Sequence, residues 1–450
     1  MGRMFGTDGV RGVANEGLTP ELAFYLGRAF AGGLNQANDE KAPVILGRDT
    51  RISGTMLEAA LVAGMTSAGV DVWRVGEIPT PGVAYLIRHC EAAGGVMVSA
   101  SHNPAQDNGI KFFGADSFKL SDDEEDRIEA MVHRLMSGDD PLPRPTGGEV
   151  GRAVARPDLG EKYAEYLLST VELDLSGRRV ILDCAHGAAF VIAPRVFEAL
   201  GADVISLHTE PDGVNINVNC GSTHISVLQQ AVLEHKADVG FAFDGDADRV
   251  IAVDETGAEV NGDHILAFCG RYLLETGRLP QRQVAATVYS NLGLQMALEA
   301  AGGSVVTTQA GDRYVLEAMR ERGLVLGGEQ SGHIIFAEYN TTGDGILTAL
   351  QVAQVMDKRG KKLSELAAEM KPLPQVLKNV AVQRRDGWDK NPAIQEAIRG
   401  AEARFGGRGR IFVRPSGTEP VIRVMGEGPE HDLVAQAVDD VCEVIRRELA

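Results

Sequence analysis

Short apolar runs alternate along the chain with stretches in which apolar residues recur at helical spacing. This alternation repeats three times and predicts three similar α/β domains with mainly parallel, mixed sheets. Beyond residue 370 the pattern changes to strand, helix, two adjacent strands and a C-terminal helix over 433–449, which predicts a smaller α+β domain. The expected domains therefore cover residues 1–148, 149–256, 257–370 and 371–450.

Several elements of the first domain carry their own local signals. Val44 begins an apolar run typical of a strand, and the apolar residues of 56–65 have helical periodicity. Ser121 and Glu124 have the spacing of a capping box, so we expect a helix to begin there. Residues 138–145, rich in proline and aspartate, are typical of a linker.

The first of four polar loops follows the apolar run that ends at Val98. Asn103-Pro104 predicts a turn, and Asn108-Gly109 predicts a second turn before Lys111 begins the next run. Ser101 is therefore expected on an exposed tip, where its hydroxyl is available for reaction. An ordinary Asn-Pro turn would have the same local pattern, so the other loops decide between the two interpretations.

The second loop carries Asp244, Asp246 and Asp248 between two apolar runs. Each like-charged pair at about 4 Å costs roughly 4 kcal/mol at an effective dielectric constant of about 20, so a hard divalent cation would relieve the repulsion. Mg²⁺ is our first choice. An EF-hand is disfavoured because Arg249 stands where that loop needs glycine and the flanks are predicted strands. A solvated acidic turn is the simpler alternative.

Three protein oxygens leave an octahedral Mg²⁺ ion incomplete, and phosphate oxygens commonly fill its shell. Ser101 could supply such a phosphate as phosphoserine. A phosphate beside three aspartates is tolerable only with a cation between them. The predicted metal site and the predicted phosphoserine therefore support each other.

The third loop offers a carboxylate, a hydroxyl and an imidazole at Glu329, Ser331 and His333. This mixture suits a polyhydroxylated ligand, because sugar hydroxyls both donate and accept hydrogen bonds. A tight hairpin with a solvated glutamate would give the same pattern, so the sugar-binding interpretation depends on the neighbouring loops.

The fourth loop has the chemistry of a phosphate cradle. Arg414 and Arg423 flank it, Ser416 and Thr418 offer hydroxyl donors, and Gly417 lets backbone N–H groups approach an anion. It lacks the P-loop motif and no predicted helix begins there, which argues against a nucleotide.

Composition narrows the class of protein. The formal charge of −19, from 44 basic and 63 acidic residues, argues against a nucleic-acid partner. No apolar run is long enough to span a bilayer, no signal peptide is evident, and the five scattered cysteines are expected to be reduced and mostly buried. A cytoplasmic location follows, whereas assembly as a homodimer is left open. Cationic residues fall in or beside the polar loops: Arg11, Arg48, Arg51, Lys111, Arg249, Arg414 and Arg423.

In this order the loops resemble those of the α-D-phosphohexomutase superfamily, most closely its branch acting on glucosamine phosphates. The resemblance covers essentially the whole chain and rests on six motifs: Phe5 to Gly12, Ser99 to Pro104, Asp212 to Asn217, Asp244 to Arg249, Gly328 to His333 and Arg414 to Pro420. It implies four domains around a central cleft, with one functional loop from each domain.

The resemblance also implies roles for individual residues. Ser101 would be the phosphoserine and, with the three aspartates, a ligand of one Mg²⁺ per chain. The third loop would bind the sugar, and the fourth would bind the substrate phosphate. Apart from the resemblance, His102 and Lys111 are candidates for a general base because they lie near Ser101 in the sequence, and a buried Lys111 beside arginines could have a lowered pKa. Arg249 completes the predicted catalytic set. Neither His102 nor Lys111 is preferred as the base.

The implied reaction converts glucosamine 6-phosphate to glucosamine 1-phosphate through a bound glucosamine 1,6-bisphosphate and supplies precursors of amino-sugar nucleotides and cell walls. A phosphomannomutase or phosphoglucomutase of the same superfamily would share nearly all of these loops. A non-catalytic protein that binds metal and phosphosugar would not need Ser101. A serine hydrolase is disfavoured because the G-x-S-x-G motif is missing.

Overall fold

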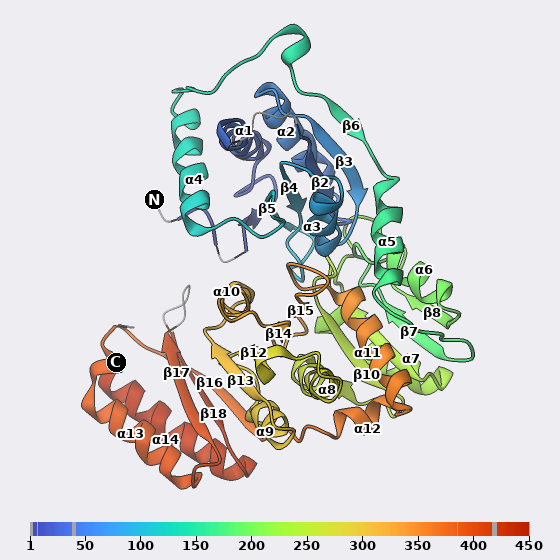
Figure 1. Ribbon diagram of the computed structural model, residues 1–450. Helices are drawn as coiled ribbons and strands as arrows, with labels where there is room; N and C mark the ends of the chain where they lie inside the picture. Colours follow the sequence, from blue (N-terminus) through green and yellow to red (C-terminus); the bar gives the residue numbers. More distant parts are fainter. Residues whose placement is uncertain (1–2, 7, 38–41, 385, 416–420, 450) are drawn as a thin grey trace. The chain divides into compact units, whose positions relative to one another are not determined.

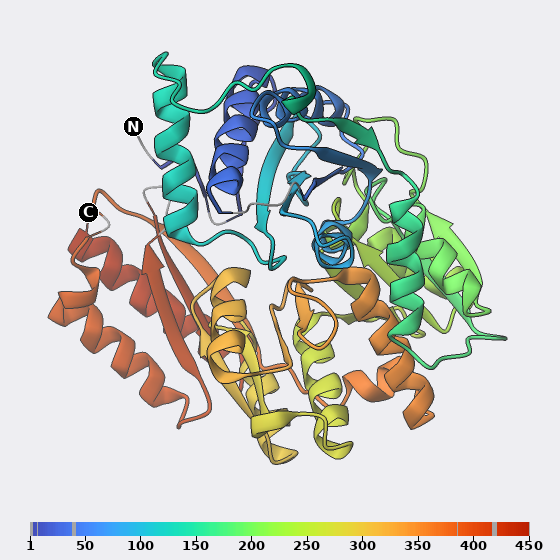
Figure 2. The same cartoon turned by 45° about the horizontal axis from the view of Figure 1, so that its top comes forward.

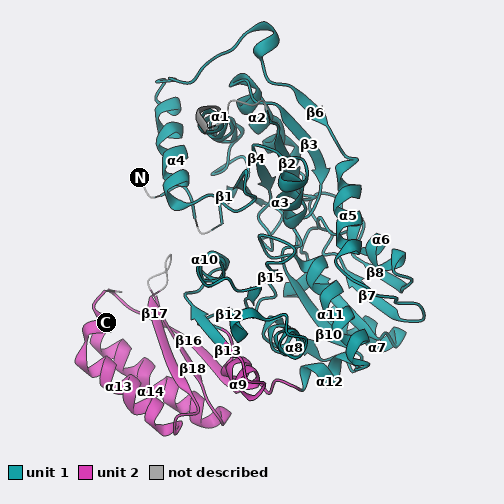
Figure 3. Ribbon diagram, viewed as in Figure 1, with its two compact units in different colours: residues 1–289, 305–368 teal, residues 290–304, 369–450 magenta. Residues whose placement is uncertain are grey.

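The computed structural model describes residues 3–6, 8–37, 42–384, 386–415 and 421–449 (Figure 1). It divides into two compact units (Figure 3). The first comprises residues 1–289 and 305–368, and the second comprises residues 290–304 and 369–450. Within the described residues the strands form four sheets, three in the first unit and one in the second.

The first sheet has the strand order β1–β5–β4–β2–β3–β6. Strands β2, β3, β4 and β6 run parallel, whereas β5 pairs antiparallel with both β4 and β1. Helices α2 and α3 make the crossovers that parallel neighbours require. The strands are β1 (Val10–Val13), β2 (Val44–Arg48), β3 (Val72–Glu77), β4 (Gly94–Val98), β5 (Asp107–Gly114) and β6 (Ala153–Ala155).

Helices cover both faces of this sheet (Figures 1 and 2). Helices α1 (Pro20–Ala37), α2 (Gly54–Ser67) and α4 (Asp122–Met136) share one apolar core with Val96 and Val98. Helix α3 (Thr80–His89) lies against the other face, close enough that a Cβ added at Gly95 would be 2.5 Å from the Ile87 side chain. The predicted capping box is confirmed at the start of α4.

The second sheet has the order β11–β10–β9–β7–β8. Its parallel strands β8, β7 and β9 are followed by the antiparallel pairs β9–β10 and β10–β11. These elements are β7 (Arg179–Asp183), β8 (Asp203–Leu207), β9 (Val239–Phe243), β10 (Val250–Asp254) and β11 (Glu259–Val260), with helices α5 (Leu159–Ser169), α6 (Ile192–Ala199) and α7 (Ser226–His235) and 3₁₀ turns η1 (Gly147–Glu149) and η2 (Gly221–Thr223).

The third sheet has the order β13–β12–β14–β15, with β12 parallel to β14 and β14 antiparallel to β15. Its elements are β12 (Gln283–Thr287), β13 (Ser304–Thr308), β14 (Leu326–Gly328), β15 (Ile334–Phe336), α8 (Gly262–Glu275), α10 (Asp312–Arg322), α11 (Gly345–Arg359), α12 (Leu363–Ala367) and the 3₁₀ turn η3 (Pro280–Arg282). In the described ranges, no helix has the length and hydropathy needed to cross a membrane.

The second unit is built on the antiparallel sheet β16–β18–β17. Its helices α13 and α14 pack on the sheet through one apolar core, and the pattern matches the predicted α+β domain. Its elements are α9 (Leu292–Ala300), β16 (Gln375–Ala381), η4 (Trp388–Lys390), α13 (Pro392–Arg404), β17 (Arg410–Pro415), β18 (Val421–Glu427) and α14 (His431–Leu449).

The predicted fold class of three α/β domains and a smaller α+β domain is confirmed. The exact boundaries between domains remain predictions, and so does the arrangement of all four around one cleft. The five cysteines are free thiols, and all except Cys90 are buried.

Candidate active site

Each of the four polar loops joins two adjacent antiparallel strands. The loops lie between β4 and β5, β9 and β10, β14 and β15, and β17 and β18. One prediction near the first loop is wrong: Asn108 and Gly109 lie within β5, where they pair with Gly12 and Arg11 of β1. The pairing with β1 keeps these two residues in an extended ladder, although their local sequence favours a turn.

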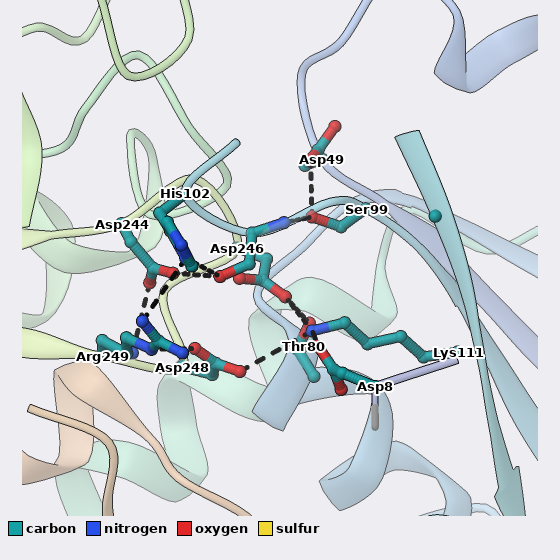
Figure 4. Close-up of polar contacts among 12 residues, drawn as sticks. Asp8, Asp49, Thr80, Ser99, His102, Lys111, Asp244, Asp246, Asp248 and Arg249 are labelled. Atoms are coloured by element: carbon teal, nitrogen blue, oxygen red, sulfur yellow. Dashed lines mark hydrogen bonds and ion pairs between the residues drawn. The ribbon is translucent and has the colours of Figure 1, made fainter. Parts of the chain in front are cut away.

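Ser101 lies in the turn after β4 but is buried, with 2% of its surface exposed, so the predicted exposed tip is wrong. The aspartate loop of the second sheet covers it. Its φ of 52° is in the left-handed region, which is uncommon for serine. The Ser101 N–H donates to Ser99 Oγ at 2.9 Å, and Ser99 Oγ donates to Asp49 Oδ2 at 2.6 Å (Figure 4).

The Ser101 hydroxyl points at the aspartate loop and donates to Asp244 Oδ2 at 2.5 Å. Oxygens of Asp244, Asp246 and Asp248 lie within 4.8 Å of one another, and all three residues are buried. Burial and the two neighbouring carboxylates raise the pKa of Asp244 well above its usual value. Among the described residues, Asp246 Oδ1 and Asp248 Oδ1 have no hydrogen-bond partner. This donor set fits a hard divalent cation.

Lys111 projects from β5 into the same cluster (Figure 4). Its Nζ lies 2.8 Å from Asp246 Oδ2 and 2.9 Å from Asp8 Oδ2. Burial alone would lower the pKa of Lys111, but these carboxylates raise it far above its usual value. The expectation of a lowered pKa is therefore wrong, because the groups nearest to Lys111 are carboxylates and not arginines.

His102 lies between Ser101 and Arg249. Its Nδ1 is 3.4 Å from Ser101 Oγ and 3.3 Å from Arg249 Nη1. Burial and the charges of Arg249 and Arg11 lower the pKa of His102, which favours the neutral imidazole. The Arg249 backbone N–H also donates to Asp244 Oδ1 at 3.2 Å, so the arginine is tied to the aspartate loop.

A cavity of about 450 Å³ opens in front of these side chains. Three guanidinium groups, four carboxylates and two imidazoles line it, so it offers both hydrogen-bond donors and acceptors to a polar ligand. The lining side chains that carry charge or an imidazole are Arg3, Asp8, Arg11, His102, Asp248, Arg249, Asp312, Glu329 and His333.

The third loop reaches this cavity through two of its three predicted residues. Glu329 and His333 line the cavity. Ser331 is exposed and is not among the described residues that line the cavity. A main-chain hydrogen bond from Val250 N to Gly332 O, 3.1 Å long, joins this turn to the strand that follows the aspartate loop.

The fourth loop lies in the second unit, and Ser416, Gly417 and Thr418 fall outside the described residues. The two arginines that flank the loop are half-buried and directly opposite each other, Arg414 on β17 and Arg423 on β18. Two like charges at a cross-strand pair repel each other, so an anion between them would be stabilising.

Sequence reasoning missed part of the charged cluster. Asp8 lies inside the motif of residues 5–12, but the sequence pattern did not indicate its role. Lys119 and Asp312 lie outside all six motifs. Lys119 Nζ lies 2.6 Å from Asp8 Oδ1 and 2.5 Å from Asp312 Oδ2, so it joins the first and third sheets. Arg48, predicted near the site, instead pairs with Glu58 and Glu77.

Known proteins resemble the chain over its full length. It is 56% identical over 445 residues to a phosphoglucosamine mutase of Desulforudis audaxviator, covering 99% of this chain and 98% of that protein. It is 53% identical over 450 residues to a phosphoglucosamine mutase of Geobacillus kaustophilus, covering 100% of this chain and 99% of that protein.

Two solved structures share the fold. One is a phosphoglucomutase/phosphomannomutase family protein of Burkholderia thailandensis, with a TM-score of 0.82, 24% identity and coverage of 99% of this chain and 97% of that chain. The other is an Aspergillus fumigatus N-acetylphosphoglucosamine mutase in complex with GlcNAc-6P and magnesium, with a TM-score of 0.72, 19% identity and coverage of 99% of this chain and 96% of that chain.

Four domain families match successive parts of the chain. They are described as phosphoglucomutase/phosphomannomutase alpha/beta/alpha domains I, II and III, at residues 2–138, 161–257 and 261–373, and the C-terminal domain, at residues 377–444. These four matches and the relatives more than half identical over the full length agree with the resemblance found in the loops. The chain therefore belongs to the phosphoglucomutase/phosphomannomutase family.

Proposed function

We propose that this protein interconverts glucosamine 6-phosphate and glucosamine 1-phosphate through phosphorylated Ser101. The observation that carries the proposal is the Ser101 hydroxyl, 2.5 Å from Asp244 in a buried aspartate triad beside a cavity that three arginines help to line. The names of the full-length relatives support the choice of a hexosamine phosphate as substrate. A cytoplasmic location and a homodimeric assembly remain predictions.

The reaction has two balanced half-steps. The bond between Ser101 Oγ and phosphorus breaks as the free sugar hydroxyl forms its own bond to phosphorus and loses its proton, so a 1,6-bisphosphate is bound and Ser101 is left as a hydroxyl. After the bisphosphate turns over, Ser101 Oγ takes the other phosphoryl group and the vacated sugar oxygen takes a proton. Catalysis of this kind is mostly positioning and stabilisation of charge.

The proton must move between the sugar oxygen and a nearby side chain. His102 lies 3.4 Å from Ser101 Oγ, and Lys111 lies 2.8 Å from Asp246, so both are within the reacting cluster. We keep both residues as candidates for proton transfer. Arg249, on the wall of the cavity, would bind the transferring phosphoryl group.

Asp244, Asp246 and Asp248 would hold one Mg²⁺ ion, with a phosphate oxygen of phosphorylated Ser101 as a further ligand. The two carboxylate oxygens without hydrogen-bond partners among the described residues support this assignment. When bound, the ion would neutralise charge on the transferring phosphoryl group.

Substrate orientation would come from the third and fourth loops. Glu329 and His333 would bind the sugar, because both line the cavity. Arg414 and Arg423 would bind the phosphate that does not react, together with Ser416, Gly417 and Thr418. Because this cradle would receive either phosphate of the sugar, the bisphosphate could react in both orientations. Ser331, which is exposed, would contact only a ligand that extends beyond the cavity.

The preference for glucosamine has a physical basis in Glu329. Much of the 2-amino group is an ammonium at neutral pH, and a carboxylate in a partly desolvated cavity favours a cation over a neutral hydroxyl. We expect kcat/KM for glucosamine 1-phosphate to exceed that for glucose or mannose 1-phosphate by at least about tenfold, equivalent to about 1.4 kcal/mol.

Parallel assays of the three sugar phosphates test this preference. Intact-mass measurement before and after phosphatase treatment tests the phosphoserine, with Ser101→Ala as the control that cannot be phosphorylated at this position. A clear preference for glucose or mannose phosphate would favour a phosphoglucomutase or phosphomannomutase. Turnover by Ser101→Ala would exclude the phosphoserine mechanism.

A further inference from the structure

The turn that contains Ser101 is held by hydrogen bonds from one buried arginine. Arg51 has no exposed surface, and its guanidinium pairs with Asp49 through Nε and Oδ2 at 2.9 Å. Its terminal nitrogens donate to four main-chain carbonyls of the turn: Ser101 at 2.8 Å, Asn103 at 2.9 Å, Pro104 at 2.5 Å and Asp107 at 3.1 Å. A planar guanidinium suits this task, because its donors are fixed in direction.

A second side chain holds the same turn from the second sheet. Asn217 ends the motif of residues 212–217, and its Nδ2 donates to the carbonyl oxygens of Ser101, at 2.9 Å, and Asn103, at 3.1 Å. Asn217 is 9% exposed, and its N–H donates to Ala185 O at 2.9 Å. The carbonyls of Ser101 and Asn103 therefore each accept one hydrogen bond from Arg51 and one from Asn217.

The two holding segments are also joined to each other. Ile52 N, next to Arg51, donates to Gly213 O at 2.9 Å, and Gly213 belongs to the Asn217 motif. The aspartate loop approaches the same carbonyl, because a Cβ added at Gly245 would lie 2.5 Å from Ser101 O. The position of Ser101 relative to the aspartates thus depends on these contacts between the first and second sheets.

This arrangement accounts for the backbone conformation of Ser101. A serine with a φ of 52° persists only where its surroundings enforce that conformation, since the left-handed region costs a non-glycine residue free energy. With both lone-pair directions of its carbonyl oxygen occupied, the peptide plane after Ser101 is fixed. The direction of the Ser101 Cα–Cβ bond is fixed with it, and from there the hydroxyl donates to Asp244.

We propose that Arg51 and Asn217 are positioning residues, which hold the Ser101 turn of the first sheet against the aspartate loop of the second, in the geometry required for phosphoryl transfer between Ser101 and the sugar. This inference rests on the proposed function, since it assumes that Ser101 carries the phosphoryl group. Neither side chain contacts the sugar in this scheme, so their loss should slow transfer without weakening substrate binding.

The test compares Asn217→Gly with Asn219→Gly. Both asparagines have a left-handed φ, 60° and 53°, so glycine relieves the backbone equally at both positions, but Asn219 is exposed. Asn217→Gly should lower kcat for glucosamine 1-phosphate at least about tenfold, with KM within about threefold of the wild type. The single-turnover rate of phosphoryl loss from phosphorylated Ser101 should fall by the same factor. Asn219→Gly should match the wild type in both measurements.

A second pair of variants covers the case in which Asn217→Gly does not fold. Asn217→Asp keeps the size of the side chain but turns a carboxylate oxygen toward two carbonyl oxygens, and Arg51→Lys keeps the charge but loses the planar fork. Each should lower kcat at least about tenfold at a temperature well below its own unfolding midpoint.

The outcomes separate the two hypotheses. A wild-type protein that is inactive on all three sugar phosphates, and whose Ser101 is not phosphorylated by a hexose 1,6-bisphosphate, would overturn the proposed function. An active wild type with Asn217→Gly and Asn219→Gly equal in kcat would overturn the positioning role alone. A loss confined to KM would overturn it as well, because it would place Asn217 in substrate binding.

Discussion

Replacing Lys111 by methionine tests whether this lysine is a structural cation in a buried cluster. The ammonium lies within 2.9 Å of carboxylate oxygens of Asp246 and Asp8, and its side chain is 1% exposed, so water does not screen these charges. Methionine keeps the length of the side chain but removes the cation that pairs with Asp246, whereas Asp8 keeps its pairs with Lys119 and Arg11. Removing one partner of a buried ion pair costs about 3 to 5 kcal/mol, and we expect Lys111→Met to lower the free energy of unfolding by that amount at pH 7.

The measurement is urea unfolding of metal-free protein in excess chelator. In a Trp388→Phe background, Trp73 on β3 is the only tryptophan, so its fluorescence follows the first unit. Lys162→Met is the control, because Lys162 forms an exposed pair with Glu165. That variant should be indistinguishable from the wild type.

The pH dependence has a definite sign. Burial alone would raise the pKa of Asp8, but Lys111, Lys119 and Arg11 lower it well below its usual value. A carboxyl with a lowered folded pKa stabilises the protein above its unfolded pKa of about 3.9, and this stabilisation is lost as the pH falls. The difference between wild type and Lys111→Met should therefore be largest at neutral pH and narrow below about pH 4. A difference under about 1 kcal/mol at pH 7 would refute the buried cluster.

Three further predictions concern activity. Ser101→Ala should abolish turnover and leave the unfolding midpoint within a few degrees of the wild type, as measured by coupled assay and thermal unfolding; more than a few per cent of residual activity would contradict the proposed mechanism. Asp248→Asn should weaken Mg²⁺ binding in calorimetry, and a chelator should silence the wild type reversibly; full activity in excess chelator would show that the triad is structural. Arg414→Ala should lower kcat/KM at least about tenfold, and unchanged kinetics would mean that the phosphate binds elsewhere.

Much of the site was predictable because its loops are short connections between apolar strands. The aspartate loop, the Glu329 turn and the hairpin of the fourth loop all lie between strands that the local pattern indicated. In each case polar residues at a strand end are unlike the apolar run beside them, so the signal is contained in a few neighbouring residues.

The errors all come from contacts between distant segments. Asn108 and Gly109 are extended because β1, about a hundred residues earlier, pairs with them. Ser101 is buried because a loop more than 140 residues away covers it. Lys111 has carboxylate neighbours from distant segments, Asp8 before β1 and Asp246 in the aspartate loop, and its own surroundings in the sequence give no sign of them.

The hydrogen bond from Val250 N to Gly332 O has a consequence for how variants of this protein diverge. It joins the turn that contains Glu329 to the strand after the aspartate loop through main-chain atoms alone. Substitutions that change only the side chain therefore leave this hydrogen bond in place. The exception is Gly332, where a Cβ would lie 2.1 Å from Val250 O. Under the proposed function, a point substitution at Glu329 would therefore change the preference for the sugar while the spacing between the two loops is inherited unchanged.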